Sequence, residues 1–114
     1  MPNSGDIVDL DLGLPLGREA GFAHPALIVT SQRIMDAEPS VIHVVPLTTT
    51  IRNFETEIRI EPDKGNGLVA VSSAPCQHLR AISPQRIATV RGNVGLASLS
   101  QIRETIAVIL DLPA

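Results

Sequence analysis

The sequence has few aromatic residues and a single cysteine. Its 114 residues include two phenylalanines and no tryptophan or tyrosine, whereas 44% of them are hydrophobic. The core must therefore consist of aliphatic side chains, and only Phe22 and Phe54 offer a broad ring for stacking on a nucleic-acid base. Cys76 has no second cysteine to pair with, which excludes an internal disulfide and a cysteine-rich metal site.

Long hydrophobic runs and an excess of positive charge are also missing. No apolar run approaches the ~18 residues of a transmembrane helix, and the segment after Met1 has neither a basic region nor an apolar signal sequence. The formal net charge is −3, which argues against a protein that coats duplex nucleic acid. We expect a soluble, cytoplasmic protein with one domain over residues 1–114 and no contact with membranes.

The apolar pattern predicts a mainly β fold that ends in an α-helix. Strands are expected at residues 6–12, 24–31, 41–47, 54–60, 68–71, 77–82 and 88–90, with helical turns at 32–37 and 84–87. An amphipathic helix is expected from about Ser98, which fits a capping box with Gln101, to Pro113. This set of short strands with one terminal helix favours a small barrel or a compact curled sheet.

One polar loop leads directly into an apolar strand. Gly17 and Gly21 flank Arg18 and Glu19, and a His-Pro pair then precedes the apolar residues 26–29. Functional side chains are often found where a loop meets a rigid strand, so Arg18, Glu19 and His24 are candidates for chemistry. Histidine can act as a general acid or base near neutral pH. The alternatives are a solvated Arg-Glu pair and a histidine that caps the strand by hydrogen bonding.

Other candidate residues are more ambiguous. The hydroxyl groups of residues 48–50 could donate to a phosphate, or could bond to the backbone of a local turn. Four arginines, at positions 52, 80, 86 and 91, could form one patch or four unrelated surface charges. Strand alternation predicts that Phe54 belongs to the core, and His43 is expected in the core or at a subunit contact. The three histidines lack a metal-ligand spacing, so no metal site is predicted.

Several short motifs occur in the order and spacing of the MazF/PemK toxin family. They are Gly-Asp-Ile-Val (5–8), Gly-Arg-Glu (17–19), His-Pro-Ala-Leu-Ile-Val (24–29), Val-Pro-Leu-Thr-Thr (45–49), Gln-His-Leu-Arg-Ala-Ile (77–82) and Arg-Gly-Asn-Val-Gly (91–95). Each motif alone is weak, but the ordered set covers nearly the whole chain, which therefore resembles this family. The resemblance implies an SH3-like small barrel of the type shared by MazF and CcdB toxins, and a homodimer.

The resemblance also implies an activity and its partners. Such a protein is the toxin of a type II toxin–antitoxin system, an endoribonuclease that cuts single-stranded RNA at a short sequence without a metal or other cofactor. In that family the RNA 2′-hydroxyl attacks the adjacent phosphate, leaving a 2′,3′-cyclic phosphate and a 5′-hydroxyl. A MazE-like antitoxin, through its acidic C-terminal segment, would compete with RNA for the same arginines.

The resemblance assigns roles to individual residues. Thr48 matches the family's catalytic threonine, Glu19 matches a loop glutamate, and Gln77 and Arg80 fall beside the RNA groove. Together with His24, Thr48 and Glu19 are therefore the candidate catalytic residues. The candidate RNA-binding residues are Arg18, Phe22, Thr49, Arg52, Gln77 and Arg80.

Position 24 departs from the family pattern, which usually has a catalytic arginine before the proline. His24 could act as an acid or base, or it could lack the donor fork that arginine offers a phosphate, with loss of activity. Arg18 could then supply the missing cation. The alternatives are a catalytically impaired homologue that binds antitoxin and a CcdB-like toxin that binds DNA gyrase. The absence of a Trp-containing C-terminal tail argues against the latter.

Overall fold

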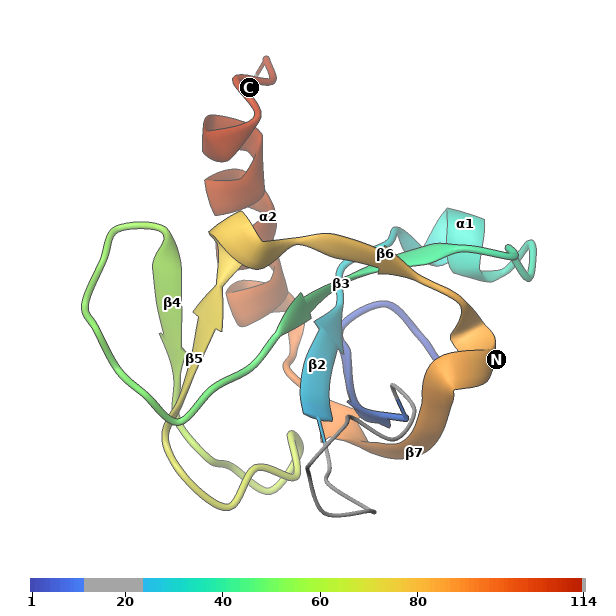
Figure 1. The fold of residues 1–114 in the computed structure, drawn as a ribbon, viewed down its shortest axis with the longest axis horizontal. Coiled ribbons are helices and arrows are strands. Elements are labelled where there is room, and N and C mark those ends of the chain that lie inside the picture. Colours follow the sequence, from blue (N-terminus) through green and yellow to red (C-terminus); the bar gives the residue numbers. More distant parts are fainter. Residues whose placement is uncertain (12–23, 114) are drawn as a thin grey trace, which may run out of the picture.

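The computed structural model describes residues 1–11 and 24–113. Its elements, labelled in Figure 1, are β1 (Asp6–Leu10), β2 (His24–Ile28), α1 (Gln32–Met35), β3 (Ile42–Pro46), β4 (Glu57–Ile60), β5 (Ser72–Pro75), the 3₁₀ turn η1 (Cys76–His78), β6 (Arg80–Ile82), the 3₁₀ turn η2 (Pro84–Arg86), β7 (Ile87–Asn93) and α2 (Leu96–Ile109). The mainly β class with a C-terminal helix is confirmed. None of the described helices is long and apolar enough to cross a membrane.

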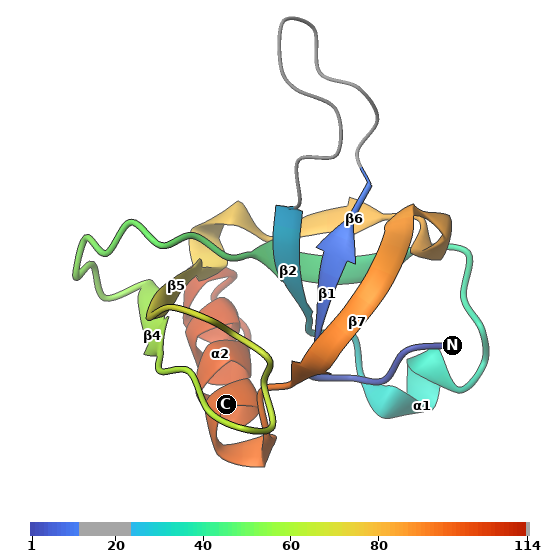
Figure 2. The same cartoon turned by 90° about the horizontal axis from the view of Figure 1, so that it is seen from below.

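The strands form one five-stranded antiparallel sheet and a separate two-stranded one. The larger sheet has the order β6-β3-β2-β1-β7, and β4 pairs with β5. Pairing of β1 with β7 contains two register shifts, and Figure 2 shows β7 running obliquely beside β1. Because β6 and β7 are the two edges among the described strands, this curled sheet is not a closed barrel.

Side-chain alternation divides the core into two clusters. Ile7 and Leu27 belong to one cluster, which also contains Ile102 of α2. Val8, which follows Ile7 on β1, and Ala26, which precedes Leu27 on β2, belong to the other cluster. Successive side chains of a strand point to opposite faces, so the central strands are buried on both sides. Figure 1 shows α2 lying beside β4 and β5 rather than beside α1.

The segment between β3 and β4 differs from the sequence prediction. The strand expected from residue 54 begins only at Glu57, and Phe54 is 55% exposed, so its predicted core position is wrong. Its ring lies 5.1 Å from the Arg52 guanidinium carbon. The strand expected at residues 68–71 is also absent, because this stretch belongs to the loop between β4 and β5. His43 is exposed rather than part of the core.

A buried asparagine organises the loop between β4 and β5. Asn66 is 1% exposed; its Oδ1 accepts from the backbone N–H groups of Asp63 and Leu68, and its Nδ2 donates to the Glu61 carbonyl. The loop packs closely on β7, since a Cβ on Gly92 would meet the carbonyl oxygen of Gly65. This contact fixes the loop against the strand that carries Arg91.

The predicted boundaries near the C-terminus also change. α2 begins at Leu96, behind Gly95 at φ +86°, and it has no side-chain cap. The capping box expected at Ser98 is therefore wrong. The last strand is longer than the predicted 88–90, because β7 spans Ile87–Asn93.

Candidate active site

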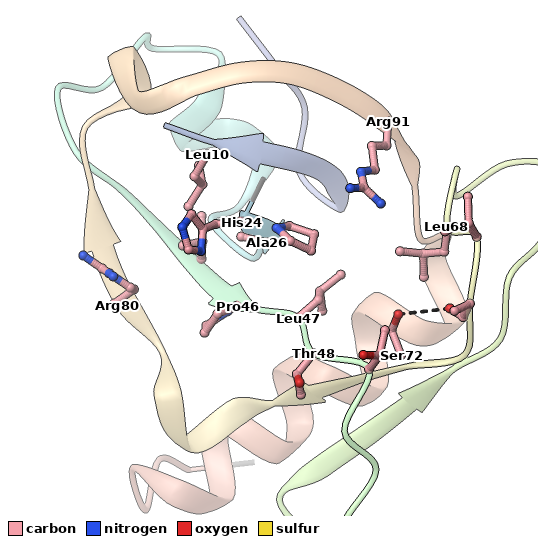
Figure 3. Close-up of a pocket in the computed structure, with 15 residues that line it drawn as sticks. Leu10, His24, Ala26, Pro46, Leu47, Thr48, Leu68, Ser72, Arg80 and Arg91 are labelled. Carbon is pink, nitrogen blue, oxygen red and sulfur yellow. Dashed lines mark hydrogen bonds between the residues drawn. The ribbon is translucent and has the colours of Figure 1, made fainter. Parts of the chain in front are cut away.

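A cavity of about 550 Å³ opens where β2 begins and β3 ends. The loop before β5 forms part of its wall, and arginines from β6 and β7 complete the lining (Figure 3). Four residues predicted from the sequence line this cavity: His24, Thr48, Thr49 and Arg80. The fold thus brings together residues that are separated by up to three strands in the chain.

His24 is the first residue of β2 and lies opposite Leu10 of β1. Its side chain is half-buried. Register places His24 and Arg80 on the same face of the sheet, because His24 shares its face with Ile28, Ile28 pairs with Val44, and Val44 pairs with Arg80. Figure 3 shows His24 and Arg80 on one side of the cavity, with Thr48 on another. An imidazole and a guanidinium thus lie at one wall of the cavity.

Thr48 follows β3 and is joined to β5 by a single isolated bridge. Its backbone N–H donates to the Ser73 carbonyl at 3.0 Å, and the Ser73 N–H donates back at 2.7 Å. The Thr48 hydroxyl oxygen accepts from the Thr50 N–H at 3.1 Å. A hydroxyl has one proton of its own to donate, and no acceptor for it is found among the described residues. Thr48 is therefore able to donate to a ligand oxygen.

Arg52 and Gln77 were predicted to bind RNA but do not line this cavity. Both side chains instead donate to the carboxylate of Glu57, Arg52 through Nη2 at 2.7 Å and Gln77 through Nε2 at 3.0 Å. The hydrogen bond from Arg52 holds the pKa of Glu57 below its usual value, although burial opposes the shift. Alternation along residues 54–60 places Glu57 on the polar face opposite Phe54, so the sequence gives no sign of its burial.

Arg91 is a cavity residue that was missing from the predicted site. It lines the cavity from β7, with its Nη2 2.9 Å from Oδ1 of Asp9. Thr89 also donates to Asp9, at 2.9 Å. Burial raises the pKa of Asp9, but the hydrogen bonds from Arg91 and Thr89 and the charge of Arg91 outweigh it, so the pKa is lowered overall. The sequence places Arg91 among four scattered arginines and at the start of the 91–95 motif, and neither pattern assigns it to the site.

Three predicted site residues, Arg18, Glu19 and Phe22, lie outside the described residues. In the described ranges, no three His, Cys, Asp or Glu side chains come together as ligands for a metal ion.

The comparisons with known proteins cover almost the whole chain. The sequence model of the family described as PemK-like, MazF-like toxin of type II toxin–antitoxin system matches residues 3–110. Endoribonuclease MazF9 of Mycobacterium tuberculosis is 29% identical over 116 residues, which cover 98% of each chain.

Solved structures of the same kind share this fold. Mycobacterium tuberculosis toxin MazF-mt6 has a TM-score of 0.75 at 24% identity, with 96% of this chain and 99% of that chain covered. An endoribonuclease from mycobacterial species, solved with its cognate antitoxin, has a TM-score of 0.76 at 24% identity, with 100% and 99% covered. The predicted MazF-type fold is thereby confirmed in a curled, open form. Because the family match extends through every described element, the chain belongs to the PemK-like, MazF-like toxins of type II toxin–antitoxin systems.

Proposed function

We propose that this toxin is an endoribonuclease that cleaves single-stranded RNA, at a short sequence, in the cavity where β2 begins. The supporting observation is that His24, Thr48, Thr49 and Arg80 line one cavity. Family membership and the endoribonuclease relative, which matches over 98% of both chains, support the same activity. A metal-independent reaction suits this set of residues, because a histidine, hydroxyl groups and arginines supply proton transfer and phosphate binding.

In the proposed reaction, the RNA 2′-oxygen bonds to the adjacent phosphorus and the bond from phosphorus to the 5′-oxygen breaks. His24 accepts the 2′-hydroxyl proton, and the leaving 5′-oxygen takes up a proton, which gives a 2′,3′-cyclic phosphate and a 5′-hydroxyl. The Thr48 hydroxyl donates to a non-bridging phosphate oxygen. Donors held at the position of the developing charge stabilise such a transition state. Glu19, in the segment that precedes β2 in the sequence, is the third proposed catalytic residue.

The proposed RNA contacts extend beyond the cavity. Arg80 and Thr49 would bind the RNA strand at the cavity, and Arg18 and Phe22, in the segment that precedes β2 in the sequence, would also contact it. Arg52 and Gln77 would bind the flanking nucleotides, which is consistent with the 45% exposure of the Arg52 side chain.

We also propose a cytoplasmic location, a MazE-like antitoxin whose acidic C-terminal segment occupies this cavity, and a homodimer. The antitoxin is supported by the relative that was solved with its cognate antitoxin. The dimer is supported by exposed apolar side chains at and just after the end of α2: Val108 is 79% exposed, and Leu112, three residues past the helix, is 55% exposed. Exposed apolar side chains that gather in this way commonly mark an interface. Sedimentation equilibrium of the pure toxin tests the dimer, and a monomeric mass would contradict it.

Incubation of the pure protein with mixed-sequence single-stranded RNA in EDTA tests the activity. We expect cleavage products with 5′-hydroxyl ends. Intact RNA together with retained antitoxin binding would instead support the catalytically impaired alternative.

Variants at position 24 test the role of the histidine. We expect His24→Ala to lower the cleavage rate by about 100-fold or more, as for loss of a general acid or base, and His24→Arg to retain more of it. His43→Ala is the matched control, because His43 is exposed and lies on the opposite face of the sheet. If both position-24 variants cleave like the parent, the role assigned to His24 is wrong.

A further inference from the structure

Glu57, the first residue of β4, carries a buried carboxylate with several donors. Its side chain is 1% exposed. Oε1 accepts from Arg52 Nε at 3.3 Å and from Ser73 Oγ at 3.5 Å, and Oε2 accepts from Arg52 Nη2 at 2.7 Å and from Gln77 Nε2 at 3.0 Å. Each carboxylate oxygen therefore has two donors.

These donors come from three separate segments. Arg52 belongs to the loop between β3 and β4, Ser73 to β5, and Gln77 to η1. A buried charge is tolerated when it is paired and hydrogen bonded, and it becomes costly when a partner is removed. The donors and the carboxylate therefore restrain one another, and Glu57 ties the three segments together beside the β4–β5 pair.

The network continues to the cavity through Ser73. Its backbone forms the two hydrogen bonds with Thr48 that make the isolated bridge. Arg52, which also donates to Glu57, lies four residues after Thr48 on the loop between β3 and β4. Through these contacts Glu57 acts on Thr48 without lining the cavity itself.

We infer that Glu57 is a positioning residue, which fixes the Thr48 hydroxyl at the cavity wall. This inference rests on the function proposed above. Misplacement of a reacting group by about 1 Å can lower a rate by about 100-fold. Loss of the carboxylate should therefore affect turnover more than substrate binding.

Glu57→Gln tests the inference, because it keeps the size of the side chain but replaces one acceptor oxygen with a donor group. We expect kcat for a short RNA to fall about 10- to 100-fold, with KM changed less than about threefold. Glu61→Gln is the matched control: Glu61 is 65% exposed at its side chain and pairs with Arg59 at 3.1 Å. The control should match the parent in both constants. A parent-like kcat in Glu57→Gln, at a temperature where it is folded, would overturn the inference.

Ser73→Ala is a second variant, for which a folding defect is less of a concern. It removes the hydroxyl that donates to Glu57 and leaves the backbone bridge to Thr48 possible. We expect a smaller fall in kcat, about threefold, again with little change in KM. An unchanged kcat would overturn the link from Glu57 through Ser73 to Thr48.

Amide hydrogen exchange, followed by NMR, separates failure of this inference from failure of the proposed function. The amides of Thr48 and Ser73 are both hydrogen bonded in the bridge, so their exchange reports its stability directly. We expect exchange at both amides to be at least about tenfold faster in Glu57→Gln than in the parent and in Glu61→Gln. If the parent does not cleave RNA but this difference is seen, the activity is wrong and the positioning role stands. Equal exchange in all three proteins would refute the positioning role itself.

Discussion

The Nη2 atom of Arg91 lies 2.9 Å from Oδ1 of Asp9, and its Nε lies 3.0 Å from both carboxylate oxygens. The two residues come from the neighbouring strands β1 and β7, which pair with an irregular register. The ion pair therefore holds the arginine of β7 in place at the cavity wall.

Replacement of Arg91 by lysine is expected to weaken RNA binding. The planar guanidinium of arginine can bond both oxygens of Asp9 and still present other donors to a phosphate. A lysine ammonium lacks this fork. We expect KM for RNA to rise about three- to tenfold, measured by initial rates on a short single-stranded substrate. Arg59→Lys, on the exposed pair with Glu61, serves as the control. An unchanged KM for Arg91→Lys would show that Arg91 takes no part in RNA binding.

The partly buried carboxylate of Asp9 and the buried carboxylate of Glu57 predict a loss of stability in acid. The pKa values of Asp9 and Glu57 are lowered from 3.8 and 4.5, respectively, so the unfolded chain binds more protons than the folded one in this range. The unfolding free energy therefore rises with pH. The stability that these two carboxylates contribute is complete above about pH 4.5, and it is lost as the pH falls through their pKa values in the folded protein. Urea unfolding between pH 3 and 6 measures this dependence. Glu57→Gln should flatten it near pH 4, and parallel curves for variant and parent would contradict the assignment.

The single thiol is expected to be unreactive in the folded protein. Cys76 is 1% exposed, and burial raises its pKa to about 11. At pH 8 the group is therefore almost entirely the neutral thiol, which is a poor nucleophile. We expect no labelling by iodoacetamide at pH 8 in native buffer and complete labelling in urea, as read by mass spectrometry. Full labelling of the folded toxin would contradict this burial.

The close packing between the β4–β5 loop and β7 predicts different effects for two glycines. A Cβ on Gly92 would meet the Gly65 carbonyl oxygen and the Asn66 backbone, whereas a Cβ on Gly65 would have only ordinary contacts, the nearest at 3.5 Å. We expect Gly92→Ala to lower the unfolding free energy by about 1–3 kcal/mol. Gly65→Ala should change it by less than about 0.5 kcal/mol. Urea denaturation of both variants measures the difference, and equal stabilities would argue against this contact.

The central strands could be predicted because their apolar residues are contiguous. β2 and β3 lie within the predicted segments 24–31 and 41–47, and both are buried on two faces. The strand at 54–60 was predicted too long. Alternation indicates which side chains share a face, but it does not indicate where the neighbouring strand begins. Its partner β5 offers only Ser72–Pro75, so pairing covers Glu57–Ile60. Upstream of that, Phe54 has no strand to pack against and is exposed.

The site residues also include some that the sequence indicates and some that it does not. His24 and Thr48 lie in short motifs and could be recognised from the order of residues. Arg91 also lies in a motif, but its place at the cavity could not be predicted, because it depends on the pairing of β7 with β1. The two residues of the Arg91–Asp9 contact are 82 positions apart. Glu57 was missed for a related reason: its burial comes from Arg52 and Gln77, five and 20 residues away.

The isolated bridge between Thr48 and Ser73 joins the end of β3 to the two-stranded sheet. Thr48 therefore belongs to the large sheet through the chain that leaves β3 and to the small sheet through its bridge to Ser73. The position of its hydroxyl depends on both sheets, so a substitution in either sheet that shifts one against the other is expected to move this donor as well.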